Sequence, residues 1–187
     1  MSLEKISAQL SNINESKNSP VSLPPIEKWN PPYCGEIDIQ VKANGDWFYG
    51  GTIFKRLPLV KLFASVMLRD EQPDSDDYFL ITPVEKVKIE VEDAPFVLTQ
   101  WAWQDTEKSV MTVMTNLEDE FVLDNNHPLT INSKGELYVT VRRNLQAKVH
   151  RNVYYQWADL AKEVVTDNGR QLIFTSAGYE FNLGVID

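Results

Sequence analysis

Apolar and polar residues alternate through the stretch EIDIQVK, residues 36–42. A period of two is typical of a β-strand that buries one face. Asn44-Gly45 follows and supplies the chemistry of a tight hairpin turn. We therefore expect residues 46–49 to return as a second strand, and residues 52–54 to form a third strand after the next glycine pair.

Helical spacing appears in two places in the first half of the chain. Residues 2–16 carry apolar residues three or four apart, which predicts a short amphipathic helix. Pro58 suits the first turn of a second helix. The apolar stripe predicted for that helix consists of Leu59, Leu62, Phe63, Val66 and Met67. Between the two helices, residues 16–35 hold five prolines and predict an extended segment that wraps the domain.

The strand–turn–strand–helix pattern recurs later in the chain. The stretch HPLTINSKGELYV, residues 127–139, matches residues 37–49 at an offset of 90, and the helical pattern that begins at Asn152 matches the earlier helix at an offset of 94. Chance similarity of common elements is the alternative to duplication. We predict an N-terminal helix and proline-rich arm over 1–34, a first half over 35–94 and a second half over 95–187. Each half is expected to be an antiparallel sheet with one packed helix, an α+β fold.

Composition restricts the classes of partner. The chain has 187 residues, 43% of them hydrophobic, and a formal net charge of −9. This charge disfavours a nucleic-acid polymer or an anionic membrane as partner. A single cysteine excludes an intramolecular disulfide and fits a reducing compartment. The first residues lack the apolar run of a signal peptide, so we expect a cytoplasmic protein.

The stretch TPVEKVKIEVEDAPF, residues 82–96, resembles the bacterial domain-of-unknown-function family 1285. The resemblance runs from about residue 29 to the C-terminus. It implies a two-part α+β fold with an internal duplication and a second half like a pleckstrin-homology domain. It further implies a ligand site where the halves meet, for a nucleotide-like molecule in signalling.

A basic run, KGELYVTVRRNLQAKVHR over residues 134–151, lies directly before Tyr154. Guanidinium groups bind phosphate and aromatic rings stack on bases, so the run indicates an anion or nucleotide pocket. Arg56, before the helix predicted after Pro58, has a position in the first half like that of Arg151 in the second. The predicted ligand-binding residues are Arg56, Thr82, Lys86, Trp101, Arg142, Arg151 and Tyr154. The alternatives are that the charged residues are solvated or paired with carboxylates, that 82–86 is a plain turn, and that the tryptophan belongs to the core.

Motifs for catalysis or metal binding are missing. The two histidines, His127 and His150, form no HExxH or Cys/His pattern, and the sequence has no GxSxG, Walker or GxGxxG motif. We predict no catalytic or metal residues and no cofactor other than a nucleotide-like ligand. The favoured interpretation is a non-enzymatic ligand-binding or sensory protein. The alternatives are a protein-interaction module that uses an edge strand or the N-terminal arm and, ranked last, a nucleotide-directed enzyme that uses Glu85 or Asp93.

Overall fold

The structure is a computed structural model that describes residues 3–15, 23–72, 75–167 and 169–186. The chain divides into two compact units, residues 1–95 and 96–187, and each is described by itself. Within the described residues, no helix has the length and apolar character needed to span a membrane.

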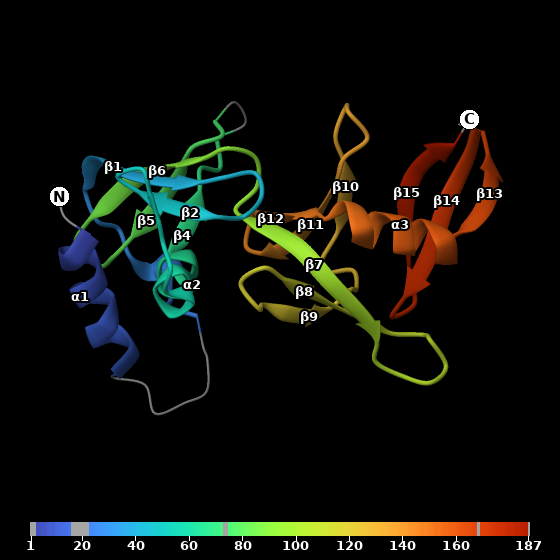
Figure 1. The fold of residues 1–187 in the computed structure, drawn as a ribbon, viewed down its shortest axis with the longest axis horizontal. Coiled ribbons are helices and arrows are strands. Elements are labelled where there is room, and N and C mark those ends of the chain that lie inside the picture. Colours follow the sequence, from blue (N-terminus) through green and yellow to red (C-terminus); the bar gives the residue numbers. More distant parts are fainter. Residues whose placement is uncertain (1–2, 16–22, 73–74, 168, 187) are drawn as a thin grey trace. The chain divides into compact units, whose positions relative to one another are not determined.

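The first unit is a six-stranded sheet with two helices beside it (Figure 1). Its elements are α1 (Leu3–Glu15), a 3-10 turn (Ile26–Lys28), β1 (Tyr33–Val41), β2 (Trp47–Tyr49), β3 (Thr52–Ile53), α2 (Leu57–Ser65), β4 (Met67–Arg69), β5 (Tyr78–Ile81) and β6 (Lys86–Val91). The strand order across the sheet is β3-β2-β1-β6-β5-β4.

The predicted hairpin is confirmed. On β1, Ile39 and Val41 are buried and pair with Tyr49 and Trp47 of β2. Gly45 has a φ of +89°, a conformation that glycine adopts without the steric cost of a side chain. The alternation therefore set both the strand and the face that it buries.

The two helices of the first unit pack against each other. Phe63 of α2 is fully buried, and Pro58 stands in the first turn, as expected. The predicted N-terminal helix is confirmed over Leu3–Glu15. Its expected end at residue 16 lies outside the described residues, as does the first part of the proline-rich arm, residues 16–22.

The second unit begins with another six-stranded sheet, which curls into a half-barrel. Its strands are β7 (Phe96–Trp103), β8 (Met111–Thr115), β9 (Glu120–Val122), β10 (Leu129–Ile131), β11 (Leu137–Arg142) and β12 (Leu145–Val149). Helix α3 (Arg151–Leu160) follows, and then a three-stranded sheet of β13 (Lys162–Thr166), β14 (Gly169–Ser176) and β15 (Tyr179–Ile186).

Helix α3 and the three-stranded sheet share a core with the half-barrel. Trp157 is fully buried against Phe174, with ring centroids 5.1 Å apart. Ser176 is also buried, and its hydroxyl oxygen accepts a 2.9 Å hydrogen bond from the backbone N–H of Met111 on β8. The C-terminal strands are thus tied to the half-barrel by apolar packing and by a satisfied buried polar group.

The prediction of antiparallel sheets was wrong for both halves. In each six-stranded sheet the first and last strands meet at the centre as a parallel pair, β1 with β6 and β7 with β12, so both sheets are mixed. A parallel pair needs a long crossover between its strands, and here the intervening strands and loops provide it. Alternation of side chains is the same in both kinds of pair and could not distinguish them.

The predicted second helix was too long. Helix α2 ends at Ser65, and Met67 is already the first residue of β4. The second half likewise has an additional sheet that was not expected, because β13 begins at Lys162, where the helical spacing of the sequence continues. Val66 and Met67 are buried, and burial alone does not distinguish a helix from a short strand.

Candidate functional site

A cavity of about 470 Å³ opens beside the start of α3 in the second unit. It is lined by Gly135, Glu136, Leu137, Lys148, Val149, Arg151, Tyr154 and Tyr155. Strands β11 and β12 supply one wall and the first turn of α3 the other. Two of the predicted ligand-binding residues, Arg151 and Tyr154, lie in this cavity.

Arg151 is the first residue of α3, and its exposed guanidinium lies 5.8 Å from the ring centroid of Tyr155. Within the described parts of the chain it forms no ion pair. The helix is capped by His150, whose Nδ1 accepts a 3.3 Å hydrogen bond from the N–H of Asn152. The first turn of a helix carries partial positive charge, which adds to that of the arginine.

Aromatic rings form the other part of this wall. Tyr154 and Tyr155 lie with their centroids 5.7 Å apart and their planes tilted by 58°. Tyr155 is about half exposed. Such rings can stack on a planar group that enters from solvent.

The strand wall carries an ion pair. The Lys148 ammonium donates to Glu136 Oε1 at 2.7 Å, and Asn132 Nδ2 donates to the other carboxylate oxygen at 2.7 Å. These bonds, led by the one from Lys148, lower the pKa of Glu136 to about 2. The carboxylate is therefore charged at neutral pH, and much of the positive charge of Lys148 is already neutralised.

The predicted ligand-binding residues do not include Lys148, Glu136 or Tyr155, which line this cavity. The hairpin register pairs Tyr138 with Lys148, so both side chains lie on one face of the sheet. Alternation counted back from Tyr138 puts Glu136 on that face as well. Lys148 and Glu136 both lie in the basic run of residues 134–151. The register of β11 with β12 was needed to show that their side chains share one face.

The remaining predicted residues of the second unit lie outside the cavity. Arg142 Nη1 donates to Asp119 Oδ1 at 2.6 Å, and its guanidinium lies 4.7 Å from the ring centroid of Phe96. Arg142 is therefore paired with a carboxylate, which was the alternative to ligand binding. Trp101 Nε1 donates to Gln156 Oε1 of α3 at 2.7 Å.

The other three predicted residues belong to the first unit. Arg56 is the exposed N-cap residue of α2. Thr82 is buried and its Oγ1 accepts the N–H of Glu85 at 3.1 Å, which closes the turn between β5 and β6. Lys86 holds its ammonium 4.0 Å from the ring centroid of Phe79. Thr82 and Lys86 thus stabilise a turn and a sheet face.

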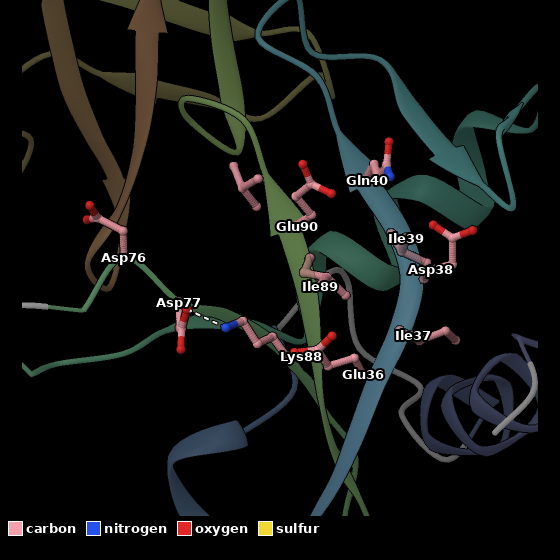
Figure 2. Close-up of a pocket in the computed structure, with 11 residues that line it drawn as sticks. Glu36, Ile37, Asp38, Ile39, Gln40, Asp76, Asp77, Lys88, Ile89 and Glu90 are labelled. Carbon is pink, nitrogen blue, oxygen red and sulfur yellow. Dashed lines mark ion pairs between the residues drawn. The ribbon is translucent and has the colours of Figure 1, made fainter.

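A second cavity, of about 560 Å³, lies over β1 and β6 in the first unit (Figure 2). Its charged lining residues are Glu36, Asp38, Asp76, Asp77, Lys88 and Glu90. The Lys88 ammonium donates to Asp77 at 2.7 Å, which raises the pKa of Lys88. No group of three or more potential metal ligands gathers in the parts of the chain that the structure describes.

Two crystal structures of similar proteins were found. A DUF1285 family protein from Silicibacter pomeroyi DSS-3 is 32% identical, with a TM-score of 0.75 over 95% of each chain. A DUF1285 family protein from Shewanella baltica OS155 is 31% identical, with a TM-score of 0.52 over 65% of this chain and 90% of that one. No curated protein matches the chain.

Two family models together match nearly all of the chain beyond its first helix. The N-terminal domain of DUF1285, a domain of unknown function, matches residues 24–94. The C-terminal domain of the same family matches residues 95–183. The resemblance inferred from residues 82–96 is confirmed, and the chain belongs to the DUF1285 family.

Proposed function

We propose that the chain is a non-enzymatic ligand-binding or sensory protein for a small nucleotide-like molecule in signalling. The observation that carries the proposal is the meeting of Arg151 and Tyr154 in one cavity of the second unit. The expectation that the ligand lies between the two halves stays a prediction, and the test below does not depend on it.

In this proposal the phosphate of the ligand binds at Arg151 and the start of α3. A guanidinium offers several donors in one plane, and the first helical turn adds backbone N–H groups of the same polarity. Lys148 is the weaker candidate because Glu136 already holds its ammonium at 2.7 Å. An anion brought close to Glu136 would also be repelled by the carboxylate.

The planar part of the ligand stacks on Tyr154 and Tyr155. Their tilted arrangement leaves Tyr155 about half exposed, so a ring can reach it without unfolding the helix. Stacking on an aromatic face tolerates different bases. We therefore expect the phosphate to dominate selectivity and the base to add affinity.

The test is a titration of the full chain with a mononucleotide, its parent nucleoside and inorganic phosphate, followed by calorimetry and thermal unfolding. A ligand at 100 times its Kd should add roughly 2.7 kcal/mol of apparent stability. Arg151→Ala should lower the affinity for the mononucleotide about 10- to 100-fold, the value of one or two charge-assisted hydrogen bonds. Glu136→Gln should raise it.

Arg170→Ala is the matched control, since Arg170 is a half-exposed arginine on β14 of the same unit. It should leave binding unchanged. Equal affinity for Arg151→Ala, Tyr154→Ala and the unmodified chain would disprove the proposed site. If the mononucleotide binds no more tightly than inorganic phosphate, the cavity is an anion site and not a nucleotide site.

A protein-interaction module is the second candidate, and one observation favours it. Strand β13 is an edge of the three-stranded sheet and is exposed along most of its length, with Val165 81% exposed. Exposed edge strands can pair with an extended segment of a partner. A captured protein that is lost with Val164→Pro but kept with Arg151→Ala would favour this function over ligand binding.

We also propose that the halves arose by internal duplication and that the second unit is related to pleckstrin-homology domains. The shared strand order supports the duplication, and the curled sheet followed by α3 supports the relation. A comparison of family sequences tests the first point. Turn glycines equivalent to Gly45 and Gly135 should recur in both halves, and their restriction to one half would contradict a duplication.

A further inference from the structure

Helix α1 lies outside the family model for the first domain. It covers Leu3–Glu15, whereas the family model for the first domain begins at residue 24. Ile6 and Leu10, one turn apart, are fully buried and fix the helix to the unit beside α2. The other side chains of residues 3–10 are exposed or partly exposed, so over this part of the helix the contact rests on a narrow apolar stripe.

Beneath this helix lies a buried carboxylate. Glu85, in the turn between β5 and β6, is 4% exposed, and its Oε2 lies 4.0 Å from the ammonium of Lys5 on α1. This lysine immediately precedes Ile6. A helix that carries a basic residue directly before its apolar stripe therefore fits this surface.

The fit of α1 is incomplete. Glu85 Oε1 is buried without a hydrogen-bond donor in the described parts of the chain, and so is Oε1 of Gln9 on the helix. Buried acceptors without donors cost free energy. One ammonium 4.0 Å from one carboxylate oxygen leaves the second oxygen unsatisfied, whereas a guanidinium can donate to both oxygens at once.

We infer that the surface beneath α1 is a docking groove for an amphipathic helix of a partner protein, and that α1 occupies it as an intramolecular substitute. The partner helix carries arginine in place of Lys5, followed by apolar residues at the positions of Ile6 and Leu10. Its guanidinium satisfies both oxygens of Glu85. Binding of the partner displaces α1, because both fill the same groove.

The test uses the full chain and fluorescent peptides of residues 3–15, with either the native lysine or arginine at position 5. Leu10→Asp in the chain releases the intramolecular helix and should tighten peptide binding by about tenfold or more, because a competing occupant has been removed. Ala8→Asp is the matched control, since Ala8 is exposed on the same helix. It should bind the peptides as weakly as the unmodified chain.

Two further comparisons separate this groove from general adhesion to apolar surface. The arginine peptide should bind Leu10→Asp more tightly than the lysine peptide does, and adding Glu85→Gln should remove the difference. Lys5→Glu provides a second way to release α1. The Lys5 side chain is 65% exposed, so this change leaves the apolar stripe intact. It therefore serves as the test variant if Leu10→Asp does not fold.

Hydrogen exchange of the α1 amides checks that the helix is released in both variants. Tighter binding in Leu10→Asp and Lys5→Glu, with the arginine preference, supports the groove. Equal binding by all variants, including Ala8→Asp, would overturn it, as would absence of binding when α1 is released. Loss of the arginine preference alone would overturn the role of Glu85.

Discussion

The two six-stranded sheets have the same strand order and differ in where the helix is inserted. In the first unit the order is β3-β2-β1-β6-β5-β4, and in the second, read in the same sense, it is β9-β8-β7-β12-β11-β10. Both consist of two three-stranded meanders joined by a central parallel pair. Helix α2 connects the two meanders of the first sheet, whereas α3 follows the last strand of the second.

This difference decides which charged surface each unit presents. Because α3 begins directly after β12, its first turn lies beside Lys148 and completes a cavity that holds Arg151 and two tyrosines. Helix α2 begins after the short strand β3, and its N-cap residue Arg56 is exposed. The first sheet instead carries acidic side chains on its open face (Figure 2). Similar sheets can therefore present different charged surfaces when the helix follows a different strand.

The largest effects are expected in the cores that the two helices complete. Phe63→Ala in α2 and Trp157→Ala in α3 each remove a fully buried ring, and each should lower the free energy of unfolding by about 3–5 kcal/mol. Chemical denaturation gives the size, and hydrogen exchange assigns the loss to residues 1–95 or 96–187. Tyr155→Ala, at a half-exposed position, is the control. A loss below about 1 kcal/mol for either buried ring would contradict the packing.

Intermediate effects should distinguish the ion pairs of the two units. Arg142 and Asp119 are bonded at 2.6 Å, and the arginine side chain is only 13% exposed. Arg142→Met leaves a partly buried carboxylate without this donor and should cost about 1–3 kcal/mol. Lys88→Met, which breaks a more exposed pair in the first unit, should cost less. Denaturation midpoints measure both, and equal losses would show that burial does not set the strength of these pairs.

The ion pair of Arg142 makes this residue unsuitable for the ligand-binding test. Arg142 was predicted to bind ligand, and its loss would weaken the fold near Asp119 and Phe96. Weaker ligand binding by an Arg142 variant would therefore not identify a contact. Arg151 is exposed and forms no ion pair within the described residues. Its substitution should therefore change ligand affinity without changing the stability of the fold.

The smallest effect concerns pH and the cavity of the second unit. Hydrogen bonds from Lys148 and Asn132, led by the one from Lys148, lower the pKa of Glu136 from its ordinary value of 4.5 to about 2 in the folded chain. The carboxylate therefore contributes its full stabilisation above pH 4.5 and loses it as the pH falls through that interval to 2. Thermal unfolding of Glu136→Gln and the unmodified chain should differ at neutral pH and converge in acid. Glu163→Gln, on the exposed strand β13, controls for the loss of a negative charge, and a difference that does not depend on pH would contradict the assignment.

Local structure could be predicted where one stretch of sequence was sufficient. The alternation of residues 36–42, the turn at Asn44-Gly45 and the helix start at Pro58 each appear in the structure where they were expected. These features depend on which residues face the core and on backbone angles that glycine or proline favours. The end of α2 could not be predicted, because Val66 and Met67 are buried in either state.

The sequence by itself determined the family, through the resemblance of residues 82–96. It also determined the α+β class and the strand faces, because periodicity and turn chemistry act over a few neighbouring residues. Only the tertiary structure decided that β1 lies beside β6 and β7 beside β12, since alternation does not specify the partner strand. It also decided that Arg142 pairs with Asp119 while Arg151 and Tyr154 share a cavity. These contacts join residues far apart in the chain or on different elements, and their geometry exists only once the sheets have formed.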